Sequence, residues 1–173
     1  MSLRGRNHTT SIPVETAGFL IVCLGASYIA LPADGVRGVL TKDDTGDKQT
    51  VTAAGTIYQP VDLAQRLFLT ADLSGPDMRT VLYSCGHSHG AIRVTQVVGL
   101  ADVERKDCFP LPPQFQCDER NWFAGMLLYQ DQLVLVLNPS WALGGAAAAA
   151  APVSVAQSEQ ICLAIPAGVG GAC

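Results

Sequence analysis

The chain has 173 residues, with 11 basic and 15 acidic side chains, which gives a formal net charge of −4. This acidic balance argues against nucleic-acid binding, because proteins of that class carry a basic face. Hydrophobic residues make up 49% of the chain and charged residues only 15%, so we expect a folded protein with one sizeable core or two small ones. Six cysteines without a CxxC pair predict buried thiols in a reducing compartment.

The first distinctive segment is the uncharged run AGFLIVCLGASYIALPA at residues 17–33, which two arginines precede. Such a run is typical of a secretory signal or a membrane anchor. It is shorter than the roughly 20 residues that a membrane helix needs, and it contains Gly25 and Pro32, which disfavour a helix. Two strands joined at Gly25 explain the same residues. We therefore expect no insertion into a membrane.

An internal repeat constrains the fold. A shift of 61 positions pairs Gly25 with Gly86 and aligns VRGV at 36–39 with VVGL at 97–100. A second echo aligns TIYQPVDLAQRL at 56–67 with QLVLVLNPSWAL at 132–143. Each copy therefore predicts a strand, a glycine turn, further strands and a short helix.

Turn residues and β-branched runs predict strands at 18–24, 27–32, 35–41, 55–60, 79–85, 90–95, 97–104, 122–129 and 132–137. Short helices are expected to begin at Asp62 and Asn138, which are good N-cap residues. The run GGAAAAAA at 144–151 is typical of a linker or a helical tail. The segment ICLAIPAGV at 161–169 resembles 28–36, which indicates an extra strand or the start of a further copy. Many short strands and a twofold echo favour two small β-barrels packed together.

Five segments, in the expected order, resemble the CheW-like domain, the coupling module of bacterial chemosensory arrays. They are FLIVCLGASYIALPADGVRGVL at 19–40, the GxxxxxVDL pattern at 55–63, RTVLYSCGHSHGAIRVTQVVGLADV at 79–103, PLPPQF at 110–115 and FAGMLLYQDQLVLVLNPSWAL at 123–143. The resemblance implies an all-β fold of two SH3-like five-stranded β-barrel subdomains that share a core, with short helices. It divides the chain into an N-terminal extension at 1–16, the domain at 17–143, and an Ala/Gly-rich linker with an apolar tail at 144–173.

The resemblance also implies a function. Members of this family are not enzymes, and they link receptors to a CheA-type histidine kinase by binding both. We therefore expect a cytoplasmic adaptor with no cofactor, catalytic residue or metal site, whose partners are such a kinase and the cytoplasmic tip of a chemoreceptor. The residues that the resemblance assigns to partner contact are Val36, Arg37, Val39, Ala54, Gly55, Ile57, Val97 and Gly99. Many members carry arginine where this chain has Ala54, so we expect the contacts at that position to be lost or redirected.

The motif GHSHG at 86–90 leaves a hydrolase as an alternative, because it satisfies the GxSxG pattern of a nucleophile elbow. In a serine esterase, Ser88 would attack an acyl carbon with help from a histidine. No histidine follows His89 in the chain, and the next residues, AIRVTQVV, favour a strand over the required helix. A hairpin turn suits these residues better.

A small zinc-binding module is a second alternative. Cys85, His87 and His89 alternate, so on a continuous strand they would face one side, with Cys108 or Cys117 as a fourth ligand. The glycines that flank the histidines favour a turn instead.

Two remaining clusters favour structural roles. The acidic segment KDDTGDK at 42–48 lacks the distant glutamate of a calcium loop, so we expect a solvated turn. Trp122, Phe123 and Trp141 are expected to pack in the core or between subdomains, because large rings bury much of their surface.

Overall fold

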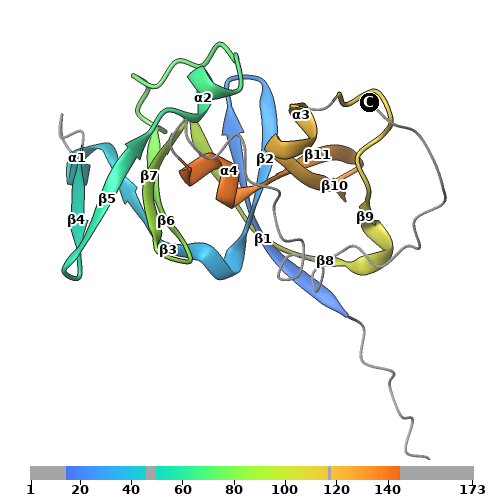
Figure 1. Cartoon of the computed structure of the whole chain (residues 1–173). Helices are drawn as coiled ribbons and strands as arrows, with labels where there is room; N and C mark the ends of the chain where they lie inside the picture. Colours follow the sequence, from blue (N-terminus) through green and yellow to red (C-terminus); the bar gives the residue numbers. More distant parts are fainter. Residues whose placement is uncertain (1–14, 46–49, 117, 145–173) are drawn as a thin grey trace, which may run out of the picture.

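The computed structural model describes residues 15–45, 50–116 and 118–144, and strands dominate it (Figure 1). The strands are β1 (Thr16–Leu24), β2 (Ser27–Pro32), β3 (Val36–Thr41), β4 (Val51–Ala53), β5 (Thr56–Val61), β6 (Arg79–Cys85), β7 (Ser88–Val94), β8 (Gln96–Glu104), β9 (Cys108–Phe109), β10 (Phe123–Tyr129) and β11 (Gln132–Leu137). The helical turns are η1 (Ala33–Gly35), α1 (Lys42–Thr45), α2 (Leu63–Arg66), η2 (Arg105–Asp107), α3 (Glu119–Trp122) and α4 (Pro139–Leu143). Within the described ranges, no helix is long and apolar enough to cross a membrane.

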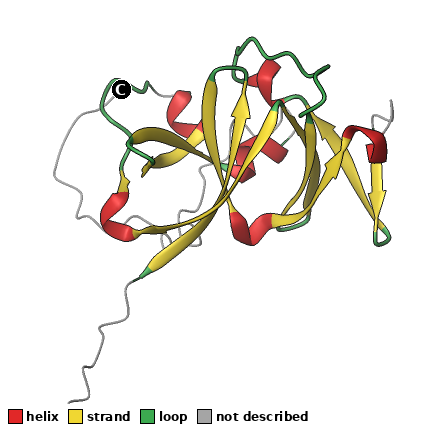
Figure 2. Ribbon diagram, turned by 180° about the vertical axis from the view of Figure 1, so that it is seen from behind, coloured by secondary structure: helices red, strands yellow, loops and turns green. Residues whose placement is uncertain are grey.

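Two sheets stand side by side, and each curls into a barrel-like arrangement (Figure 2). The sheet built around β1, here the β1 sheet, has the strand order β8-β1-β2-β11-β10-β9. The sheet built around β6, here the β6 sheet, has the order β3-β6-β7-β5-β4. The predicted all-β fold of two barrel-like subdomains with short helices is confirmed. The β1 sheet has a sixth strand, the two-residue β9.

The two copies of the sequence repeat exchange strands. The β1–β2 hairpin turns at Gly25 and the β6–β7 hairpin at Gly86, where φ is +61° and +57°, a backbone conformation that glycine adopts readily. The next strand of each copy then leaves its own hairpin: β3 pairs with β6, and β8 pairs with β1. Strands β4 and β5 also join the β6 sheet, while β10 and β11 join the β1 sheet. Each hairpin is therefore completed by strands of the other copy.

The second echo also has a structural counterpart. The β4–β5 hairpin turns through Ala54 and Gly55, with φ of +47° and +78°. The β10–β11 hairpin turns through Gln130 and Asp131, with φ of +49° and +62°. Positive φ at both central residues is the pattern of a tight two-residue hairpin loop. Equivalent positions of the repeat thus have the same backbone conformation despite different side chains.

Strand β1 explains the uncharged run near the start of the chain. Its alternating side chains reach two different cores: Leu20 and Val22 face the core that the sheets share, while Phe19 and Ile21 face the interior of the β1 sheet. All four side chains are buried. A strand that is covered on both faces has no position for a charge, so its residues form a continuous apolar run.

The shared core joins both sheets and both capped helices. Its fully buried members include Leu24 of β1, Leu63 of α2, Tyr83 of β6 and Leu137 of β11. Phe123 is buried in this core, and Trp122 and Trp141 pack against it while remaining partly exposed. The expectation that these three aromatic residues lie in the core or between subdomains is confirmed.

Both predicted helix starts are confirmed. The Asp62 carboxylate accepts a hydrogen bond from the Gln65 backbone N–H at 2.9 Å. The side-chain oxygen of Asn138 accepts one from the Ser140 N–H at 3.1 Å, with Pro139 in the first turn. These bonds satisfy backbone donors that a helix start leaves without a partner.

Other expectations need correction. Strands β4 and β9 and the single-turn helices α1 and α3 were not anticipated, because elements of two to four residues carry no periodicity. Residues 42–45 form helix α1 rather than a simple turn. Of the described cysteines, Cys23 is buried as expected, but Cys85 and Cys108 are half-buried. The predicted linker and the apolar segment 161–169 lie outside the described residues.

Candidate partner-binding surfaces

The outer strands β3 and β8 present equivalent faces on the two sheets. Exposed and half-buried residues alternate along both strands. The exposed face of β3 carries Arg37, Val39 and Thr41, here the β3 face. The exposed face of β8 carries the residues 61 positions later, Val98, Leu100 and Asp102, here the β8 face.

Both faces contain a β-bulge at the same place. In the pairing of β3 with β6, Arg37 is skipped between Val36 and Gly38. In the pairing of β8 with β1, Val98 is skipped between Val97 and Gly99. A bulge bends and twists its strand and re-aims the extra side chain, and it discourages another strand from adding to the edge. Binding at these faces is therefore expected to use side chains rather than strand addition.

The two faces differ in chemistry although their positions are equivalent. Val39 is 41% exposed beside the basic Arg37, whereas Leu100 is 73% exposed beside Val98 and the acidic Asp102. An exposed apolar residue with polar neighbours is typical of a protein-binding surface. The molecule thus carries two related surfaces that suit different partners.

The β4–β5 hairpin forms a further exposed region of the β6 sheet. Ala54 and Gly55 lie at its tip, and Ile57 follows on β5 with 57% of its surface exposed. Both tip residues have a left-handed backbone, so the tip is a tight turn that holds a side chain at position 54 in solvent.

The eight residues expected to contact partners are divided between two sheets. Those at positions 36, 37, 39, 54, 55 and 57 belong to the β6 sheet, and Val97 and Gly99 belong to the β1 sheet. Val36 and Val97 are half-buried and pack against the shared core. They therefore hold the β3 and β8 strands in place and offer little area to a partner. Arg37, Val39 and Ile57 are exposed.

Sequence reasoning did not assign several exposed apolar residues to a surface. They are Tyr28, Phe68, Val98, Phe109, Leu128 and Leu133. Val98 could have been found from the repeat, because it occupies the position of Arg37. The exposure of the others depends on how the strands and loops pack, which the sequence pattern does not carry.

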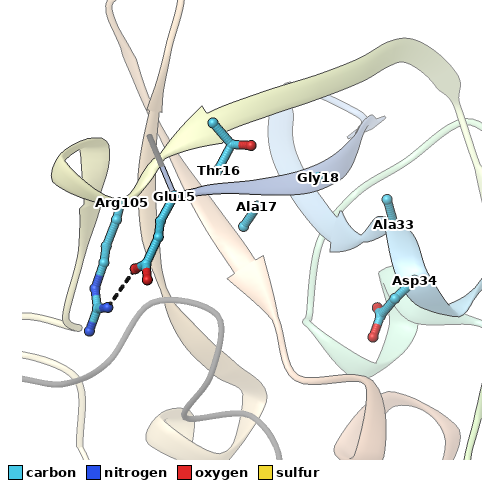
Figure 3. A pocket seen from close by; sticks show the side chains of 7 residues that line it. All are labelled: Glu15, Thr16, Ala17, Gly18, Ala33, Asp34 and Arg105. Carbon is cyan, nitrogen blue, oxygen red and sulfur yellow. Dashed lines mark hydrogen bonds and ion pairs between the residues drawn. The ribbon is translucent and has the colours of Figure 1, made fainter. Parts of the chain in front are cut away.

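A polar hollow of about 430 Å³ adjoins the β8 face (Figure 3). Three segments line it: the start of β1, the helical turn η1, and Arg105, which directly follows β8. At its rim, Arg105 forms an ion pair of 2.9 Å with Glu15. A Cβ atom on Gly18, which lines the hollow, would lie 3.5 Å from the Asp102 carboxylate. The exposed ion pair contributes little to stability, but it gives this end of the β8 face a polar border.

The GHSHG motif forms the predicted hairpin rather than a nucleophile elbow. Ser88 begins β7 and is paired with Cys85 across a two-residue turn, so a strand and not a helix follows it. His89 Nδ1 lies 2.9 Å from Ser84 Oγ, its neighbour across the hairpin. The strand-to-helix geometry on which Ser88 catalysis depends is therefore not formed.

The candidate zinc ligands do not form a cluster in the part of the chain that the structure covers. There, no group of three His, Cys, Asp or Glu side chains is placed to hold a metal ion. Cys85 Sγ lies 3.6 Å from Ser140 Oγ, and Cys117 lies outside the described residues.

The fold defines a class of all-β protein in which two barrel-like subdomains exchange strands and present equivalent outer faces. The family model of the CheW-like domain matches residues 18–144, and the chain belongs to this family. Among solved structures, the fold is similar to that of the scaffolding protein TtCheW from Thermoanaerobacter tengcongensis. The TM-score is 0.59 at 15% sequence identity, over 72% of this chain and 90% of that chain. A search of curated proteins finds no match.

Proposed function

We propose that this protein is a chemosensory adaptor that couples a receptor to a CheA-type histidine kinase by binding both, without catalysis of its own. The domain expected at residues 17–143 would carry this function. Membership of the CheW-like family supports the proposal. A partner at the cytoplasmic tip of a receptor implies that the adaptor works in the cytoplasm.

The observation that carries the proposal is the pair of equivalent but chemically different faces. A coupling protein needs two binding surfaces that are occupied at the same time. The β3 face and the β8 face lie on different sheets, and each has an exposed aliphatic residue beside a charged one. The charge is positive on the β3 face, at Arg37, and negative on the β8 face, at Asp102. An apolar anchor within a polar rim is sufficient for a reversible protein contact.

The β4–β5 hairpin and Arg37 extend the β3 face in the proposed interface. Ile57 supplies a second exposed apolar side chain on the β6 sheet, and Ala54 and Gly55 form a small tip. Since alanine reaches less far than the arginine of many family members, we propose that partner contacts at this tip are weaker or different in kind.

Isothermal titration calorimetry with a CheA-type regulatory domain and with a receptor-tip fragment tests the proposal. Val39→Asp and Leu100→Asp each place a carboxylate in the centre of one face. We expect each variant to weaken binding of one partner by about tenfold or more, since an unpaired charge at an apolar contact costs more than 1.4 kcal/mol. The other partner should bind each variant as it binds the unmodified protein.

Leu133→Asp is the matched control, because Leu133 is also a strongly exposed leucine, at 64%, but lies on β11 away from both faces. It should leave both affinities unchanged. If the folded, unmodified protein binds neither partner, the proposed function is wrong. Equal weakening of both partners by each variant would instead show that the two faces do not act separately.

A further inference from the structure

Three aromatic side chains form a partly exposed array at one end of the shared core. Phe68 follows α2, Trp122 ends α3 and Trp141 lies in α4. The ring centroids of Phe68 and Trp122 are 6.1 Å apart, and those of Trp122 and Trp141 are 5.5 Å apart in a stacked arrangement. These three residues are here named the aromatic surface.

Phe68 is held in an unfavourable conformation at this surface. Its φ is +55° and 84% of its area is exposed. A bulky residue rarely adopts a left-handed backbone, and an exposed phenylalanine leaves apolar area in water. This left-handed residue ends helix α2, where the Leu69 N–H donates to the Ala64 carbonyl at 2.9 Å, and it directs the Phe68 ring into solvent, where the ring is available for contact.

The chain leaves the described domain beside this surface. Arg66 Nη1 donates hydrogen bonds to the backbone oxygens of Trp141, Ala142 and Gly144, at 3.2, 2.8 and 2.9 Å. These bonds fix the end of α4 and the position of Gly144. Trp122 also lines a hollow of about 300 Å³, together with Phe115 and Phe123. An apolar segment that follows residue 144 therefore starts next to an open apolar site.

The sequence beyond residue 144 supplies such a segment. Residues 145–173 contain one charged side chain, Glu159, and the apolar run ICLAIPAGV occupies 161–169. Sixteen residues, 145–160, separate this run from Gly144. A random coil of 16 residues spans about 20–24 Å, which is ample for a site whose Trp141 lies only four residues before residue 145. Tethering by such a linker holds the apolar run at an effective concentration of about 1 mM near the surface. A dissociation constant well below this concentration is therefore sufficient for high occupancy.

We propose that the aromatic surface is the docking site for residues 161–169 of the same chain. Ile161, Leu163 and Ile165 provide the apolar contacts, and Phe68 and Trp122 provide the surface that receives them. This contact is independent of the proposed receptor and kinase partners, because it uses neither the β3 face nor the β8 face.

Intrinsic fluorescence of the full chain tests the proposal directly, because the only two tryptophans of the sequence, Trp122 and Trp141, both belong to the aromatic surface. The triple variant Ile161→Asp, Leu163→Asp, Ile165→Asp should shift their emission to longer wavelength. It should also raise the acrylamide quenching constant by about twofold, as the indoles lose their cover. The matched control is Ala147→Asp, Ala149→Asp, Ala151→Asp, which adds the same charges with the same spacing and should change neither value.

A second variant separates docking from folding. On a Phe68→Gly background, the triple substitution should change the emission and quenching less than it does in the unmodified chain, because the two sites are coupled. Circular dichroism establishes that each variant is folded. The proposal is overturned if the folded triple variant keeps the emission and quenching of the unmodified protein. It is also overturned if the effect depends on protein concentration, which would assign the docked segment to a second molecule.

Discussion

Tyr83 fixes the point at which the chain crosses from the β1 sheet to the β6 sheet. Its hydroxyl donates a hydrogen bond of 2.8 Å to the Pro32 carbonyl. Its ring lies against Gly35, where any Cβ atom would collide with it. Burial raises the pKa of Tyr83 far above its usual range, and the nearby Asp34 carboxylate raises it further. One side chain of the second copy thus positions the crossing segment of the first.

We predict that Tyr83→Phe lowers the free energy of unfolding by about 1 kcal/mol at pH 7, through loss of this hydrogen bond. The pKa of Tyr83 is higher in the folded than in the unfolded state, where it is about 10. The neutral Tyr83 hydroxyl therefore stabilises the fold fully below about pH 10, and this stabilisation is lost as the pH rises above that value. The phenylalanine variant has no such loss. Urea unfolding at pH 7 and pH 10.5 should therefore show the difference shrinking, whereas a constant difference would contradict the assignment.

At the scale of elements, helices α2 and α4 hold the two copies together at one end of the shared core. Both are single-turn helices with a capping side chain, and Leu63 and Ala142 are buried between them and the sheets. Arg66 joins α2 to the carbonyl end of α4. A guanidinium at a helix C-terminus satisfies carbonyls that have no partner within the helix.

We predict that Arg66→Gln destabilises the protein by about 2 kcal/mol, since several charge-assisted hydrogen bonds to backbone oxygens are lost. The control is Arg120→Gln, because Arg120 of α3 is exposed and its side chain donates to the nearby Phe115 carbonyl, five residues before it in the chain. The control should change stability by less than about 0.5 kcal/mol. Equal effects of the two substitutions in urea denaturation would show that Arg66 does not join the helices.

Local features of these elements could be predicted from the sequence, but their partners could not. Gly25, Gly86, Asp62 and Asn138 mark turns and caps because each acts on its own neighbouring backbone. The repeat identified equivalent strands, yet it does not encode that β3 crosses to β6, since pairing is decided by long-range packing. Likewise, alternation predicted that half of the β3 and β8 residues face outward, but only the fold assigns Val36 to the core side and Val39 to solvent.

For the whole molecule, strand exchange makes the two halves of the sequence mutually dependent. The β6 sheet takes β3, β4 and β5 from the first copy, and β6 and β7 from the second. The β1 sheet takes β1 and β2 from the first copy and β8, β9, β10 and β11 from the second, and the shared core lies between the two sheets. Neither copy can complete a sheet from its own strands.

We predict that a protease site inserted between Ser74 and Gly75, in the connection from α2 to β6, can be cut without separating the fragments. The cut protein should elute as one species in gel filtration and should dissociate only in denaturant. The reason is that both sheets and the shared core contain residues from both fragments. Each fragment prepared alone should lack a cooperative unfolding transition. Separation under native conditions, or cooperative unfolding of one fragment, would contradict this view.

The double burial of β1 also has a consequence for synthesis of the protein. Strand β1 leaves the ribosome well before its pairing partner β8, which ends at Glu104, and before β11, which pairs with β2 and ends at Leu137. Until these late strands emerge, an apolar strand that belongs between two cores is left uncovered in the nascent chain. Such long-range pairing slows folding and exposes intermediates to aggregation. A chaperone that shields apolar nascent segments would therefore act on β1 until β11 has been synthesised.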